Sequence, residues 1–221
     1  GAQLESLTNE AAIYALREGQ KKIGPRHFSA AIDKVMMGEK TDKKATQEER
    51  ERVAVHELGH AVVAEVVQPG SVSRVCLSPR GQALGYVRQH PGEDRYLYTR
   101  GYIEGRIMVC LAGAVAEQEF YGDRSTGARN DFEQAHRYIR TLIQTGLSDM
   151  GIVDPELVSK EQMHQETVRI LQELEERTSR ILSGRRREME HALKILLKEE
   201  VLSGEEFRRL FCTHAPEAVP N

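Results

Sequence analysis

The stretch VAVHELGHAV, residues 53–62, is the feature that most limits how this chain can fold. His56 and His60 are four residues apart, so on an α-helix they lie on one face and can offer their imidazole nitrogens to a single metal ion. Glu57 flanks that position, where it could accept a proton from a water molecule that the metal has acidified. The alternative is an amphipathic helix that keeps two histidines in its core.

Local signals place this stretch inside a long helix. Thr46 followed three residues later by Glu49 is a capping-box pattern, and Gln68-Pro69-Gly70 is expected to end the helix. Gly59 leaves the helix surface bare between the histidines. Either another backbone or a substrate passes close to it, or it serves simple helix packing.

A catalytic zinc site needs a third protein ligand and one open position. Val63 and Val66 stand where the extended motif HExxHxxGxxH has its glycine and third histidine, so the third ligand must come from elsewhere. Two carboxylates compete: Glu117 in AGAVAEQEF and Asp131 in STGARNDFEQA. Asp131 is at an expected helix start, where capping is the commoner role of such a residue. The spacing leaves the choice open.

The remaining pattern predicts a mainly α protein with a small β-hairpin or sheet. Alternation of apolar and polar residues predicts strands at 71–79 and 85–89. Helices are expected over 4–38 as a pair broken at Gly24-Pro25, and over 99–121 and about 131–145. A further helix is expected from 155 to about 182, then a break at Ser183-Gly184, a helix that ends at Glu200 and a short one after Ser203. Asn130 with Glu133 and Ser203 with Glu206 are two further capping patterns. Five histidines after the HELGH stretch are expected to be solvated: His90, His136, His164, His191 and His214.

Composition excludes several classes of protein. A net charge of -3 and a pI near 6.3 show no excess of positive charge that could attract nucleic acid, so neither DNA nor RNA is an expected partner. The three cysteines form no CxxC pair, which points to a reducing compartment. We expect no membrane segment, because no run of 18 apolar residues occurs, and no export signal, because the N-terminus lacks a charged-then-apolar pattern. A GxxxxGK[ST] loop for nucleotide phosphates is also missing.

Four segments, taken in order, resemble the FtsH-like, membrane-tethered AAA+ zinc metalloproteases: VAVHELGHAVVAE, LSPRGQALGYV, PGEDRYLYTRGYIEGRIMVCLAGAVAEQEFYG and STGARNDFEQAHRYIRTLI. The N-terminal piece LTNEAAIYALREGQKKIGPRHFSAAIDKVMMG resembles the end of the helical lid of the AAA+ module in that family. The resemblance covers about residues 4–211. Departures occur at Gln118, where the family usually has a second glutamate, at Thr145-Gly146, where it has Trp-Gly, and in a short connector between Met150 and Glu161.

The resemblance implies a role for each candidate residue. It makes His56, His60 and Asp131 the zinc ligands and Glu57 the general base. It puts Glu117 near the site, where it would orient a ligand histidine. It also implies that the strand near Gly85, Tyr86, Val87 and Arg88 offers its edge to an extended substrate, against the alternative of an ordinary structural hairpin.

At the scale of the chain, the resemblance implies a helical zinc-metalloprotease domain at 42–214, preceded at 1–41 by the C-terminal helices of an AAA+ lid and followed at 215–221 by a flexible tail. Its function would be that of a zinc endopeptidase domain that degrades unfolded or membrane proteins, as a homo-oligomer, by resemblance a hexamer. ATP would be needed only by an ATPase core in a full-length parent protein. That parent would be anchored in a membrane, and this domain would lie on the cytoplasmic side or in an organelle matrix or stroma. Two alternatives are a non-catalytic helical assembly module stabilised by metal, and an HExxH peptidase that works without a motor.

Overall fold

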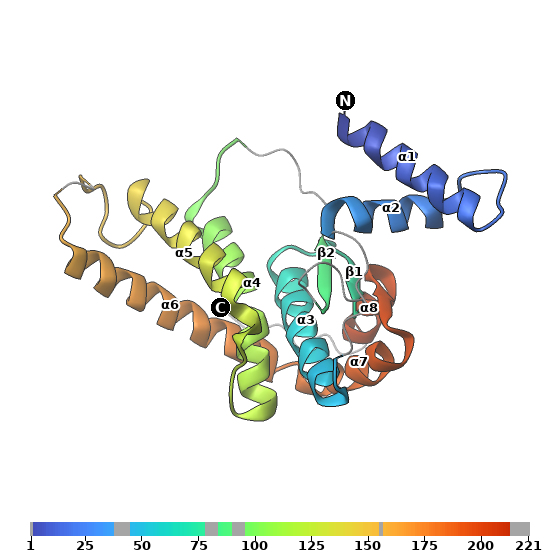
Figure 1. Cartoon of the computed structure of the whole chain (residues 1–221). Helices are drawn as coiled ribbons and strands as arrows, with labels where there is room; N and C mark the ends of the chain where they lie inside the picture. The colour runs from blue at the N-terminus through green and yellow to red at the C-terminus, as the bar shows by residue number, and fades with distance from the viewer. Residues whose placement is uncertain (1, 38–44, 78–83, 90–95, 155–156, 213–221) are drawn as a thin grey trace. The chain divides into compact units, whose positions relative to one another are not determined.

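A computed structural model describes residues 2–37, 45–77, 84–89, 96–154 and 157–212 (Figure 1). The predictions for His90, His214, the tail 215–221 and most of the linker around residue 42 lie outside these residues. The chain divides into two compact units, one made of residues 1–45 and 78–85 and the other of residues 46–77 and 86–221. Within the described part of the chain, none of the helices is long and apolar enough to cross a membrane.

The first unit contains the expected pair of helices, α1 (Ala2–Arg17) and α2 (Pro25–Met37). Pro25 opens α2, a position that tolerates proline because the first N–H groups of a helix have no partner within it. The two helices pack through small buried residues, among them Ala11, Ala15 and Ala31. The prediction of two helices is confirmed, although the break between them begins earlier than predicted and covers residues 18–24.

In the second unit, α3 (Gln47–Val67) contains the HELGH stretch. The capping box is confirmed, because the Thr46 hydroxyl accepts from the Glu49 backbone N–H while the Glu49 carboxylate accepts from the Thr46 N–H. At the other end, the Glu65 carboxylate accepts from the backbone N–H groups of Gly70 and Val72. Both ends of α3 are thus fixed by local hydrogen bonds.

The most buried helix of this unit is α4 (Arg100–Tyr121), which packs against α3, α5 (Arg129–Gln144) and α6 (Lys160–Ser183). A Cβ atom on Gly59 of α3 would lie 2.6 Å from the Ala112 carbonyl oxygen and 2.6 Å from the Ala116 Cβ of α4. The backbone that passes close to Gly59 is therefore that of α4, and Gly59 serves helix packing. This close crossing brings the HELGH face of α3 against the middle of α4.

The sheet has three strands in the order β2-β1-β3. The predicted hairpin is present as β1 (Val72–Cys76) paired antiparallel with β2 (Tyr86–Gln89). The third strand, β3 (Val201–Ser203), pairs antiparallel with the other side of β1 and was not predicted. Three residues are too few to display an alternating pattern, and this pairing joins positions more than a hundred residues apart. Among the described strands, β2 is at an edge.

Two helix starts differ from the predictions. Residues 126–128 form a short 3-10 helix that runs directly into α5, whose N-cap is Ala128 with no side-chain cap bond. The proposed Asn130–Glu133 capping box is therefore wrong, because the backbone is already helical at Asn130. The helix α6 begins after a capping box of Ser159 with Gln162, later than the expected start at 155.

The last elements follow the predicted order. Helix α6 ends at Ser183, as expected, and α7 (Arg186–Glu199) and α8 (Gly204–Cys212) follow. The Ser203–Glu206 capping pattern is confirmed, since the Glu206 backbone N–H donates to the Ser203 hydroxyl and the Ser203 N–H donates to the Glu206 carboxylate. Together with the small sheet, these helices make the fold mainly α, as predicted.

Candidate metal centre

Three side chains from two helices converge on one point. His56 and His60 project from α3, and their Nε2 atoms are 3.0 Å apart. Asp131, in the first turn of α5, places its Oδ2 atom 3.4 Å from the Nε2 of His56 and 3.5 Å from the Nε2 of His60. In the described chain these three residues form the one group of histidine, cysteine or acidic side chains whose donor atoms can hold a metal ion together.

The other nitrogen of each imidazole fixes which tautomer is present. The Nδ1 of His60 is 2.7 Å from the Val109 carbonyl oxygen, which can only accept, so Nδ1 must hold the proton. The Nδ1 of His56 is 2.8 Å from Glu117 Oε1, and by the same reasoning it donates to that carboxylate. Both Nε2 atoms are then left with lone pairs that face Asp131. Such a convergence of electron pairs requires a positive charge at its centre.

The pKa shifts of His56 and Asp131 agree with this need. Burial opposes a charged imidazole and is the largest single influence on His56, but hydrogen bonds to Asp131 and Glu117 outweigh it and raise the pKa of His56 to about 10. For Asp131, burial acts against ionisation, and hydrogen bonds to the two histidines overcome it and hold the pKa far below its usual range. The cluster thus favours bound positive charge, whether a proton or a metal ion.

The donor set fits zinc. Zinc in proteins is usually held by nitrogen and oxygen atoms at about 2.0–2.2 Å in a tetrahedral arrangement, which sets neighbouring donor atoms about 3.3–3.5 Å apart. The separations of 3.0, 3.4 and 3.5 Å between the donor atoms of His56, His60 and Asp131 are close to that spacing. A zinc ion held by these three residues would have one tetrahedral position open, which is typical of catalytic rather than structural zinc sites.

Glu117 lies behind His56 rather than beside Asp131. Its Oε1 accepts from the His56 imidazole and from the Ser125 hydroxyl, and its Oε2 accepts from the Ser125 backbone N–H at 2.8 Å and from the Arg52 guanidinium at 3.1 Å. Burial would raise the pKa of Glu117, but these hydrogen bonds dominate and lower it to about 2. Glu117 is therefore an ionised, firmly held acceptor that orients the His56 ring.

Two residues of this network were not predicted. Arg52 lies one helical turn before His56 on the same face of α3, and that i to i+4 spacing was the available signal. Ser125, in the turn between α4 and α5, had no comparable signal. Its contact with Glu117 depends on how that turn folds back.

Gly113 of α4 makes room for the imidazole of His56. A Cβ atom at this position would lie 2.5 Å from both the Cε1 and the Nε2 atoms of the ring. These distances are far below van der Waals contact, so the ring rests directly on the helix backbone. The sequence contains Gly113 in the run LAGAVAE, but nothing in that run indicates which ring it faces.

Glu57 is buried next to the cluster. Burial is the main cause of its raised pKa, and the nearby histidines act in the opposite direction. A carboxylate in such surroundings holds a proton more readily than one in water does. Glu57 therefore suits a group that takes up a proton and returns it.

The remaining predicted residues are spread along the sheet and the helices. Tyr86 is buried in the edge strand β2, Val87 and Arg88 are half-buried in it, and the buried Gly85 precedes it. His136, His164 and His191 are exposed, as predicted.

Comparison with known proteins gives evidence on the family that does not depend on this geometry. Residues 43–210 match the family described as Peptidase family M41. The chain is 36% identical over 245 residues to the "ATP-dependent zinc metalloprotease FtsH" of Thermotoga maritima, covering 99% of this chain and 40% of the relative. The protein of the same name from Acidimicrobium ferrooxidans is 37% identical over 232 residues, which cover 95% of this chain and 35% of the relative. The one from Marinobacter nauticus is 41% identical over 151 residues, 67% of this chain and 24% of the relative. The chain thus spans 40% or less of the length of these relatives.

Proposed function

The chain belongs to peptidase family M41, and from this premise we propose that residues 42–214 are a zinc-dependent endopeptidase domain that cuts unfolded polypeptide. The observation that supports the proposal most directly is the convergence of the His56 Nε2, His60 Nε2 and Asp131 Oδ2 atoms beside the buried Glu57. In this proposal the three converging residues hold the ion and Glu57 is the general base.

A zinc ion held by His56, His60 and Asp131 would supply Lewis acidity, which would polarise the scissile carbonyl and acidify a water molecule. Glu57 accepts the proton of the attacking water, which its raised pKa favours, and then donates it to the amine of the leaving peptide. Glu117 and the Val109 carbonyl hold the two imidazoles in the tautomer that leaves Nε2 free. The edge strand β2 would receive an extended substrate by adding it to the sheet.

The wider context follows from the relatives, whose names describe ATP-dependent zinc metalloproteases. We infer that residues 1–41 end the lid of an ATPase module, that residues 215–221 are a tail, and that the whole protein uses ATP to feed unfolded or membrane proteins to the site. We also propose a hexamer anchored to a membrane, with this domain on the cytoplasmic side or in an organelle matrix or stroma.

Two variants test the assignment of roles. Glu57→Gln is expected to keep zinc at the wild-type stoichiometry and to lose proteolysis by a factor of about 10² or more, because only the base is lost. Asp131→Ala is expected to lose zinc affinity, while Glu133→Ala, an exposed acid two residues further along α5, keeps it. Zinc content by metal analysis and cleavage of short unstructured peptides, which need no motor, are the measurements. Full activity of the Glu57 variant would refute the base assignment.

The same preparation separates the alternatives. A helical assembly module would bind zinc in a closed four-ligand shell and cut no peptide. A peptidase that needs no ring would be a monomer at micromolar concentration in sedimentation experiments and would ignore long unfolded chains. The proposed endopeptidase cuts both short peptides and flexible chains such as casein.

A further inference from the structure

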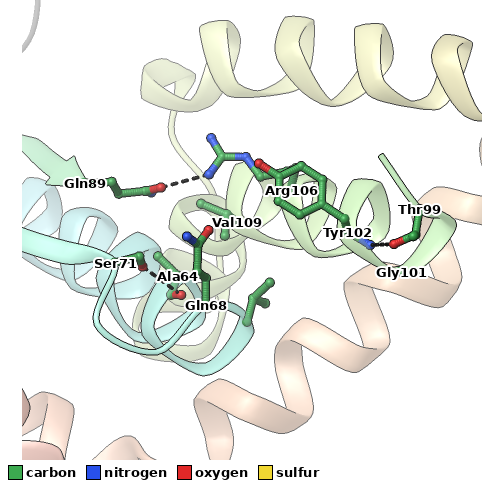
Figure 2. Close-up of a pocket in the computed structure, with 10 residues that line it drawn as sticks. Ala64, Gln68, Ser71, Gln89, Thr99, Gly101, Tyr102, Arg106 and Val109 are labelled. Carbon is green, nitrogen blue, oxygen red and sulfur yellow. Dashed lines mark hydrogen bonds between the residues drawn. The ribbon is translucent and has the colours of Figure 1, made fainter. Parts of the chain in front are cut away.

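A cavity of about 290 Å³ opens between the C-terminal end of α3, the first half of α4 and the end of β2 (Figure 2). Tyr102, Arg106 and Val109 line it from one face of α4, and Gln89 lines it from the last position of β2. This volume is large enough for any amino-acid side chain. All of these elements belong to the second unit of the chain, so the cavity is formed within one compact body.

The cavity adjoins the metal centre. Val109, one of its lining residues, is the residue whose carbonyl accepts the Nδ1–H of His60. Ala64, another lining residue, is one helical turn beyond His60 on α3. A peptide positioned for cleavage at His56 and His60 therefore has side chains within reach of this space.

Arg106 gives the cavity its chemical character. In the part of the chain that the structure describes, its polar partner is the Gln89 side-chain oxygen, a neutral acceptor 2.8 Å from Nη1. No acidic residue is among the described residues that line the cavity. Figure 2 shows the side chains of Arg106, Gln89 and Gln68 directed toward the same space. A guanidinium has five N–H donors, so most of those of Arg106 remain for a ligand.

The edge strand leads to this cavity. Gln89 is the last residue of β2, and an extended chain added to that edge passes the Gln89 side chain that holds Arg106. Side chains of an added strand alternate between the two faces of the sheet. One of them at a time can therefore turn into the cavity.

We propose that this cavity is a substrate subsite that selects an acidic side chain, glutamate or aspartate, near the scissile bond, with Arg106 as the specificity-determining residue. The inference rests on the proposed peptidase function and deepens it. Arginine pairs with carboxylates through two parallel N–H···O bonds, which a glutamine cannot reproduce and a lysine would oppose by charge. The tethering bond from Gln89 keeps the guanidinium at the cavity and so limits the entropy lost when a carboxylate binds.

The test uses the zinc-loaded full chain and a set of unstructured peptides that differ at one position. Glutamate, glutamine or lysine is placed in turn at each peptide position near the cleaved bond, and kcat/KM is measured for each peptide. We expect glutamate to be favoured over glutamine on the order of tenfold, and lysine to be disfavoured, at one position only. Arg106→Gln should abolish this preference, Arg106→Lys should keep part of it, and Arg106→Glu should reverse it in favour of lysine.

Binding supplies a second readout that does not depend on turnover. The same labelled peptides are titrated into zinc-loaded Glu57→Gln protein and followed by fluorescence anisotropy. Arg100→Gln is the matched control, because Arg100 is on the same helix but is engaged with Glu104 and Asp149. Equal binding and cleavage of the three peptides, or a preference that survives Arg106→Gln, would overturn the inference and leave the peptidase function standing. Failure of the wild type to cut any peptide would count against the peptidase function. In that case the anisotropy measurements alone would test whether the cavity selects an acidic side chain.

Discussion

At the scale of single residues, the contact between Gly113 and the His56 ring is the tightest constraint on the metal centre. Gly113→Ala would place a methyl carbon 2.5 Å from the ring, which must then move from its position beside His60 and Asp131. We expect zinc affinity to fall by about tenfold or more, a loss like that caused by removing a group that orients a ligand. Competition with a chromogenic zinc chelator measures it.

Gly101→Ala in the same helix is the control for this change. A Cβ atom at Gly101 meets no other atom within 4 Å, so the substitution adds the same methyl group without a collision. It should leave zinc affinity unchanged and stabilise α4 slightly, because alanine favours helix over glycine by up to about 1 kcal/mol. If both variants bound zinc as tightly as the wild type, the position of the His56 ring would not depend on the absence of a side chain at Gly113.

At the scale of the element, the capping box of α3 supports the helix that presents both histidines. Thr46→Ala removes the hydroxyl that accepts from the Glu49 N–H, and we expect the free energy of unfolding to fall by about 1 kcal/mol. Urea unfolding with a chelator present measures it without a contribution from metal binding.

Asn130→Ala is the matched substitution at the start of α5. The N-cap of that helix is Ala128 and the Asn130 side chain is exposed, so its removal should change the free energy of unfolding by less than about 0.5 kcal/mol. A cost equal to that of Thr46→Ala would contradict the helix start that the structure gives.

At the scale of the whole second unit, α4 and α6 are joined by a half-buried carboxylate. Glu104 of α4 accepts from Arg100 at 2.6 Å and from Arg177 of α6 at 2.9 Å. Burial works against ionisation of Glu104, but the two arginines outweigh it and lower its pKa. Because the folded-state pKa is below the unfolded value, this pairing stabilises the fold above the unfolded pKa of about 4.5 and is lost as the pH falls through the folded pKa.

Glu104→Gln is therefore expected to lower the melting temperature at pH 7 and to matter progressively less as the pH is lowered below about 4.5. Melting curves at several pH values, recorded with a chelator so that loss of metal does not contribute, measure the difference from wild type. Glu176→Gln, on the exposed side of α6, makes the same change of charge and serves as the control. A constant difference between Glu104→Gln and wild type at all pH values would show that ionisation of Glu104 does not stabilise the fold.

The sequence by itself determined the features that depend on neighbours along the chain. The spacing of His56, Glu57 and His60 places two candidate metal donors and the proposed base on one helix. The Thr46 capping box and Pro69-Gly70 bound that helix, because helical periodicity and capping act within a few residues. The family resemblance pointed to Asp131, whereas spacing alone left Asp131 and Glu117 as equal candidates.

Only the tertiary structure decided which carboxylate lies with the imidazoles. The crossing of α3 and α4 at Gly59 sets Glu117 behind His56, and the turn through Ser125 brings Asp131 to the Nε2 atoms. The same holds for Gly113 under the His56 ring, for β3 beside β1, and for Arg106 with Gln89 at the cavity. Each of these contacts joins residues far apart in sequence, so it depends on how whole elements pack, which no local pattern encodes.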